Sequence, residues 1–297
     1  MILAGTEIED TFAEAFPMTG TRLILTALTT EWARTAAQVV TGYAASVIGC
    51  DTEASIEAEI PAEQSPDGRP GVSLLFFAFS RDALQKALVN RIGQCVLTCP
   101  TTACYNGLPE VTDKTIRIGG NLRFFGDGWQ MSKVLAGRRY WRIPVMDGEF
   151  LCEDIFGTVK GVAGGNFLIL GTDQRTTLLA AERAVTAIRR MSGVILPFPG
   201  GVVRSGSKVG SRYKGLRAST NDAYCPTLRG VTNTALPEGV NAVYELVFDG
   251  VDLPTVETAT RIGVRAAIGP GIARISAGNY GGKLGPYHLH LRKLLAD

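Results

Sequence analysis

The order of apolar segments limits the fold of this chain more than any other feature of its sequence. In the first half, four apolar runs are typical of strands, and two stretches with helical periodicity are typical of helices. The expected strands are residues 22–28, 46–50, 72–79 and 95–98, and the expected helices are residues 31–42 and a stretch after Ser80. The order strand–helix–strand–strand–helix–strand is that of the ferredoxin-like unit.

The first expected helix has a plausible start at Thr30, because threonine can cap the free amide groups of a helix N-terminus. Helical spacing gives each of the two helices one apolar face. These faces carry Trp32, Ala36, Val39 and Val40 in the first helix, and Leu84, Ala87, Leu88 and Ile92 in the second.

The second half has the same order of segments without an obvious sequence repeat. Its expected strands are residues 167–170, 194–196, 242–248 and 273–276, and its helices run through residues 178–188 and from Pro254. Three further short strands are expected between the halves, at residues 121–125, 140–145 and 149–152.

These segments predict an α+β fold of two ferredoxin-like (βαββαβ) lobes with antiparallel sheets. We place the boundary near Val145, which gives an N-terminal lobe of residues 1–145 and a C-terminal lobe of residues 146–297.

Charge and composition favour a cytoplasmic protein that binds neither nucleic acid nor membrane. Thirty Lys and Arg against 28 Asp and Glu give a net charge of +2, without the basic excess of nucleic-acid binders. No run of 18 apolar residues predicts a membrane span, and Glu7, Glu9 and Asp10 stand where a secretory signal would be basic. Six cysteines spread over 297 residues are expected to be reduced thiols.

Glycine clusters at residues 163–166, 199–201 and 278–285 mark three loops of the second half. Such loops let backbone N–H groups approach a ligand closely. Tight turns between strands are the alternative for any single cluster.

Residues 201–208 have the spacing of a phosphate-binding loop, but Ser207 stands at the position of the phosphate-binding lysine. We therefore exclude nucleoside triphosphate hydrolysis. The segment keeps a basic character suited to a carboxylate- or phosphate-bearing substrate, although a solvated charged loop is an equal alternative. Its cations are Arg204, Lys208, Arg212 and Lys214.

Glu245 is the most informative single residue. Strand alternation puts it on the same face as Val243 and Val247, where desolvation would raise its pKa and suit it to proton transfer. In the alternative interpretation, the core face is formed by Tyr244, Leu246 and Phe248, and Glu245 faces water.

No metal site is expected. His288 and His290 share a strand face, but they are the only histidines and no Cys-x-x-Cys pair accompanies them. Cys95 and Cys99 are weak ligand candidates, and Cys225 has no histidine nearby to activate it as a nucleophile.

Taken together, seven stretches resemble the formylmethanofuran:tetrahydromethanopterin formyltransferase family. They follow one another in order over nearly the whole chain, and such a set is far more specific than a lone glycine motif. The stretches are residues 8–16, 66–72, 91–96, 124–128, 161–167, 218–227 and 275–285.

The resemblance implies formyl transfer between a methanofuran-type amine and a tetrahydromethanopterin-type pterin, with both carriers as substrates. It also implies two ferredoxin-like lobes, a homo-oligomer that is a dimer of dimers, and no tightly bound cofactor or metal. The near-neutral charge departs from the acidic archaeal members and suggests a bacterial methylotroph version. In that setting we expect a partner, a zinc-dependent formyl hydrolase subunit of the amidohydrolase type.

The resemblance assigns roles to particular residues. Glu245 matches the family's buried carboxylate and would carry the proton between the attacking nitrogen and the leaving amine. Gly281 and Gly282, with Asn279 or Asn221, could donate to the developing oxyanion. The residues proposed to hold the anionic tail of the methanofuran-type carrier are Ser207, Lys208 and Lys283.

Two alternatives stay open at this point. Tandem ferredoxin-like lobes could form a non-catalytic binding or assembly subunit, because this fold hosts many functions. The chain could instead hydrolyse the formyl group itself, but it lacks the histidine-rich metal site that such hydrolysis ordinarily uses.

Overall fold

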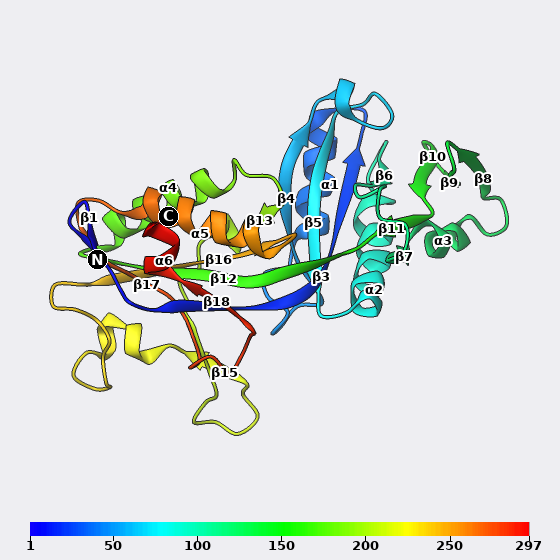
Figure 1. Cartoon of the computed structure of the whole chain (residues 1–297). Helices are drawn as coiled ribbons and strands as arrows, with labels where there is room; N and C mark the ends of the chain where they lie inside the picture. Colours follow the sequence, from blue (N-terminus) through cyan, green and yellow to red (C-terminus); the bar gives the residue numbers. More distant parts are fainter. Residues whose placement is uncertain (297) are drawn as a thin grey trace. The chain divides into compact units, whose positions relative to one another are not determined.

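The computed structural model describes residues 1–296 as a mixed α/β protein made of two compact units (Figure 1). One unit is Met18–Gly161, and the other combines Met1–Pro17 with the chain from Val162 onward. Asp297, the last residue of the predicted C-terminal lobe, lies outside the described residues.

Four strands and two helices form the centre of the unit Met18–Gly161. The strand β5 pairs with β4 and β3, and β3 pairs with β6, so the order is β4–β5–β3–β6 with every neighbouring pair antiparallel. The elements are β3 (Phe12–Thr26), α1 (Thr30–Thr41), β4 (Glu53–Ile60), β5 (Gly71–Ala78), α2 (Arg81–Arg91) and β6 (Ala103–Asn106).

The two helices of this unit begin at side-chain caps. The hydroxyl of Thr29, one residue before the expected cap, accepts from the amide of Trp32, and Ser80 accepts from Ala83. The expected inward face of α1 was partly wrong, because Trp32 and Val39 are 42% and 54% exposed. The helix buries Ala33, Ala36, Ala37 and Val40 instead.

Three predicted strands of the first half were wrong. Residues 46–50 form a turn in which Cys50 N–H donates to the Ser46 carbonyl. Residues 95–98 continue α2 through a π-helical turn, Ile92–Val96, since a short apolar run suits a helix as well as a strand. Residues 121–125 lie in α3 (Gly119–Leu122) and the 3₁₀ turn η3 (Arg123–Gly126).

The rest of this unit is an extension built on β6. The strand β10 pairs in parallel with β6, so the expectation of purely antiparallel sheets does not hold here. β10 also pairs with β9, and β9 with β8, both antiparallel. The remaining elements are η1 (Ala62–Gln64), β7 (Thr115–Arg117), β8 (Met131–Leu135), β9 (Arg138–Val145), β10 (Gly148–Glu153) and β11 (Ile155–Gly157).

The other unit repeats the same strand order. Its order is β13–β16–β12–β17 with antiparallel neighbours, and β2 extends it in parallel beside β17. The elements are β1 (Ile2–Leu3), β2 (Thr6–Ile8), β12 (Val159–Gly171), α4 (Gln174–Ile188), β13 (Val194–Ile195), β16 (Ala242–Gly250), α5 (Leu253–Ala267), β17 (Ile272–Ser276), β18 (Tyr287–His290) and α6 (Leu291–Ala296).

Between β13 and β16 the chain makes a long excursion with little regular structure. It contains a two-stranded hairpin, in which β14 pairs with β15, and a series of 3₁₀ turns. These elements are η4 (Pro199–Gly201), β14 (Ser207–Val209), β15 (Ala218–Thr220), η5 (Asp222–Tyr224) and η6 (Pro226–Leu228).

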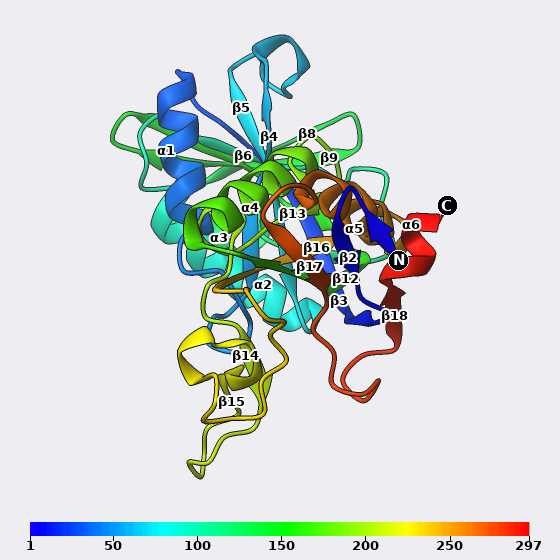
Figure 2. The ribbon, with the colours of Figure 1, turned by 90° about the vertical axis from the view of Figure 1, so that its left-hand side faces the viewer.

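The sheet of this unit has two differently covered faces. Figure 2 shows α4 and α5 on one side of the strands and the β14–β15 segment on the other. Phe167, Leu246 and Phe248 pack with the helices in the main core, whereas Leu168 and Leu170 pack with Leu236, Val240 and Val243 on the opposite face. The excursion therefore covers the face on which the candidate site is built.

Candidate active site

Glu245 lies in the middle of β16, on the face away from the helices. It pairs with Leu168 of β12, and its backbone exchanges two hydrogen bonds with Val203, at 2.8 and 2.9 Å. The strand alternates as expected, since Leu246 and Phe248 belong to the helix-packed core and Glu245 shares the opposite face with Val243. That opposite face is itself covered by a small apolar cluster.

The environment of Glu245 favours its protonated form. The side chain is half-buried under the excursion, and no residue from 1 to 296 forms a hydrogen bond with its carboxylate. Burial raises the pKa of Glu245 to about 7. A carboxyl group with a pKa near neutrality can both accept and return a proton, which is what general acid–base catalysis requires.

Gly278, in the loop after β17, forms one wall beside Glu245. A Cβ built at Gly278 would lie 3.7 Å from Glu245 Oε1 and 3.2 Å from Asn166 Oδ1. The side chain of Asn166 fixes this backbone, since Oδ1 accepts from Gly278 N–H at 2.6 Å and Nδ2 donates to the Gly278 carbonyl at 3.3 Å. Gly278 thus lies directly beside the carboxylate, and Asn166 holds its backbone in place.

Tyr280 connects the same loop to the β14 hairpin. Its hydroxyl donates to the backbone carbonyl of Ser207 at 3.4 Å. Burial, followed by the negative charge of Glu245, raises the pKa of Tyr280, so the phenol lies within electrostatic reach of the carboxylate. The structure therefore brings Glu245, Tyr280 and Ser207 together from three separate segments.

The glycine-rich loop around Asn279 is tied to the N-terminal strand. Asn279 Nδ2 donates to Thr11 Oγ1 at 3.0 Å and to the Phe12 carbonyl at 3.2 Å, while its Oδ1 accepts from Gly281 N–H at 3.3 Å. The Asn279 amide is thus used to shape the loop. Gly281 and Gly282 both have positive φ, 71° and 75°, and Lys283 is exposed.

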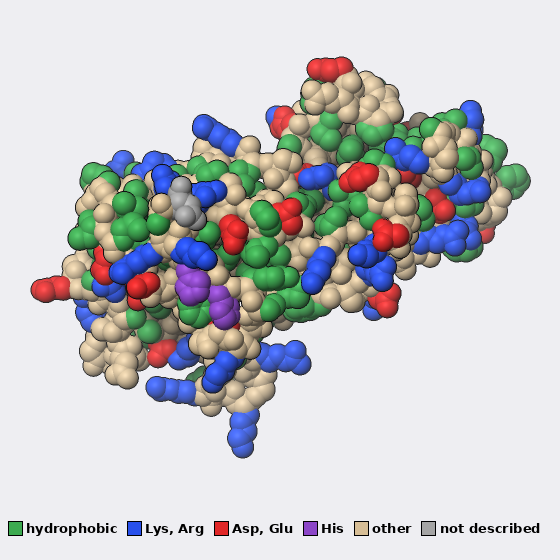
Figure 3. Space-filling view, viewed as in Figure 1, with side chains coloured by type: hydrophobic (Ala, Val, Ile, Leu, Met, Phe, Trp, Pro, Cys, Tyr) green, Lys and Arg blue, Asp and Glu red, His purple; other side chains and the backbone are tan. Residues whose placement is uncertain are grey.

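The hairpin of β14 and β15 carries a group of cations that project into solvent, and Figure 3 shows basic side chains around it. Lys208 forms an ion pair with Asp222, and both side chains retain exposure. This pairing lowers the pKa of Asp222. Asn221 lies beside the pair, and its backbone N–H donates to the Gly206 carbonyl at 3.0 Å. The exposed cations of the hairpin are Arg204, Arg212, Lys214 and Arg217.

Sequence reasoning missed three polar residues of this region: Asn166, Tyr280 and Glu14. Each had a signal, since Asn166 and Tyr280 follow or lie within glycine clusters and Glu14 interrupts an apolar strand. Their long-range hydrogen bonds, however, link positions more than 70 residues apart, and single-sequence periodicity does not report such contacts.

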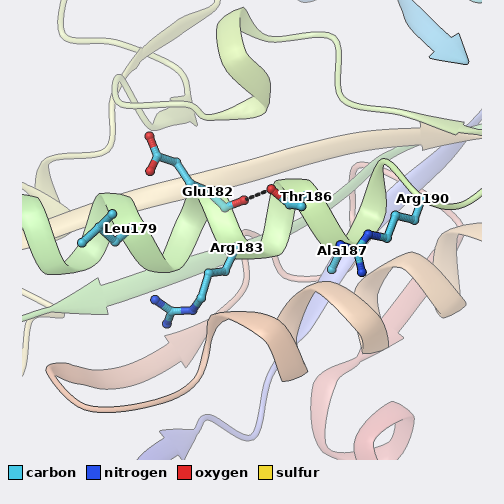
Figure 4. A pocket seen from close by; sticks show the side chains of 6 residues that line it. All are labelled: Leu179, Glu182, Arg183, Thr186, Ala187 and Arg190. Carbon is cyan, nitrogen blue, oxygen red and sulfur yellow. Dashed lines mark hydrogen bonds between the residues drawn. The ribbon is translucent and has the colours of Figure 1, made fainter. Parts of the chain in front are cut away.

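Other candidate features lie elsewhere or have structural roles. A surface hollow runs along α4, on the helix-covered side of the sheet (Figure 4), and Arg183 within it donates to the carbonyls of Ala266 and Ala267 at the end of α5. The rings of His288 and His290 contact the Phe12 ring in tilted arrangements, with centroids 4.7 and 5.2 Å away. Within residues 1–296, no three His, Cys, Asp or Glu side chains converge as a metal site would require.

Comparison with known families decides what this site belongs to. The family model described as formylmethanofuran–tetrahydromethanopterin formyltransferase matches residues 1–145, and the model of the proximal lobe of the same enzyme matches residues 148–294. The chain belongs to the formylmethanofuran–tetrahydromethanopterin formyltransferase family. The resemblance found in the sequence is thereby confirmed.

Relatives of this formyltransferase family match the chain over its full length. A formylmethanofuran–tetrahydromethanopterin formyltransferase from Methylobacillus flagellatus is 57% identical, covering 100% of both chains. One component of the formyltransferase/hydrolase complex of Methylorubrum extorquens is 53% identical, covering 99% of this chain and 97% of that component.

Two solved structures of the formyltransferase family have closely similar backbones. The enzyme from Methanosarcina barkeri superposes with a TM-score of 0.93 at 49% identity, covering 99% of this chain and 100% of the other. A chain of the formyltransferase/hydrolase complex from Methylorubrum extorquens, solved with methylofuran, gives a TM-score of 0.96 at 51% identity, covering 99% and 98%.

Proposed function

We propose that this chain transfers a formyl group between a methanofuran-type amine and a tetrahydromethanopterin-type pterin, directly and within a ternary complex. The chain is a formyltransferase, as its full-length relatives are. The observation that carries the mechanism is Glu245, a half-buried carboxylate without a hydrogen-bond partner among residues 1–296, beside Gly278 of the glycine-rich loop.

The chemistry needs one group that moves protons. The attacking amine loses a proton as the new C–N bond forms, and the departing amine gains one as the old C–N bond breaks. Glu245, with its pKa raised to about 7, suits both steps and returns to its starting state, so no covalent enzyme intermediate is required. The two carriers would be held together on the face that the excursion covers, which converts the attack into an intramolecular step.

The surrounding residues supply the binding groups. Lys208, Ser207 and Lys283 would hold the anionic tail of the methanofuran-type carrier, with the carboxylates of the tail competing with Asp222 for Lys208. Donors for the developing oxyanion are proposed from the Gly281–Gly282 backbone, with Asn221 or Asn279. Asn221 is the better side-chain candidate, since the Asn279 amide already binds Thr11 and Phe12.

We also propose that the chain forms two ferredoxin-like lobes, residues 1–145 and 146–297. The compact units have other bounds, because β10 pairs with β6 and β9 within Met18–Gly161, while Met1–Pro17 belongs to the unit that continues from Val162. The supporting observation is the strand order, β6–β3–β5–β4 in one unit and β17–β12–β16–β13 in the other, with antiparallel neighbours throughout. In both units this places the four strands in the ferredoxin-like order fourth, first, third, second along the chain. The family models change from one to the next at the same place, between residues 145 and 148.

For its assembly, we propose a cytoplasmic homo-oligomer, a dimer of dimers, that binds a zinc-dependent formyl hydrolase subunit. The support is the Methylorubrum relative, which is part of a formyltransferase/hydrolase complex. Native mass measurement of material taken directly from its source is expected to show the hydrolase with this chain. A stable homo-oligomer alone would contradict the partner and leave formyl transfer intact.

Formyl transfer itself is tested by mixing the purified protein with the formyl donor and the pterin acceptor and following formyl-pterin absorbance. Turnover is expected for the natural chain and for Glu182→Gln, whose carboxylate is exposed on α4, but not at a comparable rate for Glu245→Gln. A protein that binds both carriers without turnover would instead be a non-catalytic binding or assembly subunit.

Among residues 1–296, no helix is long and apolar enough to span a membrane.

A further inference from the structure

Glu14, on β3, is a buried carboxylate that takes no part in the mechanism above. It is 2% exposed, and in the strand pairing it lies opposite His288 of β18. No Lys or Arg side chain from residues 1–296 forms an ion pair with it. A buried carboxylate requires compensating hydrogen bonds, so its donors identify the segment of the chain that Glu14 holds in place.

The donors to Glu14 are backbone amides of one loop. Oε1 accepts from Leu284 N–H at 2.8 Å and from Gly285 N–H at 3.4 Å, while Oε2 accepts from Tyr280 N–H. At the start of the loop, the backbone N–H of Glu14 donates to the Gly278 carbonyl at 3.3 Å. One residue therefore fixes the glycine-rich loop at its beginning, middle and end.

The fixed loop carries much of the proposed active site. Gly278 forms the wall beside the Glu245 carboxylate, Tyr280 reaches Ser207, and Lys283 projects from the outer turn. The end of the loop lies close against β3, since a Cβ at Gly285 would overlap the carbonyl oxygen of Ala15. Asn166 holds the start of this segment at Gly278, and Asn279 ties it to Thr11 and Phe12, whereas Glu14 is the residue that binds the amides of its later part.

We infer that Glu14 is a positioning residue of the formyl transfer reaction: its carboxylate gathers the amides of residues 280–285 and thereby holds the Gly278–Lys283 loop against Glu245. This inference rests on the proposed function of Glu245. The four amide donors, which include Gly282, outweigh burial and hold the pKa of Glu14 below its usual value, so the anchor is ionised throughout the range in which Glu245 titrates.

The first test compares Glu14→Gln with Glu7→Gln, a matched control whose carboxylate accepts from the side chain of Arg274 on the neighbouring strand. Gln places an N–H₂ group against the amide donors. We expect hydrogen exchange of peptides within residues 279–286 to rise about 10-fold or more in Glu14→Gln, with exchange in β16 and α5 unchanged. Glu7→Gln should leave the loop protected.

Kinetics separate positioning from mere folding. A displaced loop should lower kcat by about 10²-fold while KM for the pterin changes less, because misplacement of site groups acts on the transition state. The remaining activity of Glu14→Gln should depend on pH in the same way as the activity of the natural protein, because Glu245 itself is unchanged. Unchanged loop exchange in Glu14→Gln would overturn the inference, and so would a loosened loop with unchanged kcat.

A second variant keeps the test valid if Glu14→Gln loosens the whole unit. Gly285→Ala should push the loop away from Ala15, and with it the Leu284 and Gly285 amides away from an unaltered Glu14 side chain, so it should raise loop exchange and lower kcat in the same way. If Gly285→Ala releases the loop and turnover is kept, the positioning role is wrong. Loop exchange does not depend on the role of Glu245, so a failure of the proposed function would appear separately, as full turnover in Glu245→Gln.

Discussion

Two carboxylates, one in each unit, show opposite ways of holding a glutamate away from water. Glu57 of β4 has a side chain only 3% exposed and accepts two hydrogen bonds of 2.7 Å from Arg22, together with one of 2.6 Å from Ser73. Glu245 of β16 has no such donors among residues 1–296, and burial raises its pKa to about 7.

This contrast separates a carboxylate with a structural role from one that suits the proposed proton transfer. A guanidinium and a hydroxyl donate to the Glu57 carboxylate and stabilise its charge. Glu245 is left without compensation, which costs stability when it ionises but gives it a proton affinity matched to neutral pH. The same strand order thus supports a fully hydrogen-bonded carboxylate in one unit and, in the other, a carboxylate without donors among residues 1–296.

The largest expected effect is on catalysis by Glu245→Gln. Gln keeps the shape of the side chain but cannot exchange a proton, so turnover at saturating carriers should fall by about 10²-fold or more. Absorbance of the formyl-pterin measures it, with Glu182→Gln as the control. Full turnover in Glu245→Gln would remove the proposed role.

In the other unit, Glu57→Gln is expected to lower stability and leave catalysis unchanged. Breaking a buried, bidentate pair leaves Arg22 without its partner, so the free energy of unfolding should fall by about 2 kcal/mol or more. Denaturant titration measures the loss. The kcat of the folded fraction should stay unchanged, and a selective loss of kcat would show that Glu57 is not merely structural.

A smaller effect, of opposite sign, is expected for the stability of Glu245→Gln. Because the folded pKa of about 7 lies above the unfolded value of 4.5, the proton stabilises the fold below pH 4.5, and this contribution is lost as the pH rises from 4.5 to 7. Gln mimics the protonated form. The variant should therefore exceed the natural protein in unfolding free energy by on the order of 1 kcal/mol at pH 8, with no difference at pH 4.

The smallest expected effect is a change in KM when the exposed ion pair of Lys208 with Asp222 is broken. Such a pair contributes little to stability, so Lys208 is free to change partner when an anionic carrier arrives. Lys208→Ala should raise KM for the methanofuran-type carrier several-fold, and added salt should reduce the difference. Lys86→Ala, on α2 of the other unit, is the control; equal responses of the two variants would contradict the assignment.

The sequence predicts the regular parts of this fold because their periodicity is local. The strand expected at residues 242–248 is β16, Ala242–Gly250, and the helix expected from Pro254 is α5, Leu253–Ala267. The wrongly predicted strand at residues 95–98 was a short apolar run, which has no period to separate strand from helix, and there Leu97 N–H bonds the Ile92 carbonyl in a π-turn.

The site was only partly predictable. Strand alternation predicts the face of the sheet on which Glu245 lies. It does not predict which residues cover that face, because Leu236 and Val240 reach it from the irregular excursion. Likewise, nothing local indicates that the amide of Asn279 binds Thr11 or that Glu14 gathers the loop after β17, since both contacts span more than 260 residues. Long-range hydrogen bonds set the site, and they follow only from the assembled fold.

The central claim, that Glu245 is an uncompensated carboxylate with a proton affinity near neutrality, has a direct test. The side-chain carboxyl carbons of the glutamates can be labelled with ¹³C, and the Glu245 resonance assigned by its disappearance in Glu245→Gln. Titration of the natural protein should then show a midpoint at a pH of about 7 for this resonance. A midpoint near 4.5, the ordinary value for a solvated glutamate, would contradict the account.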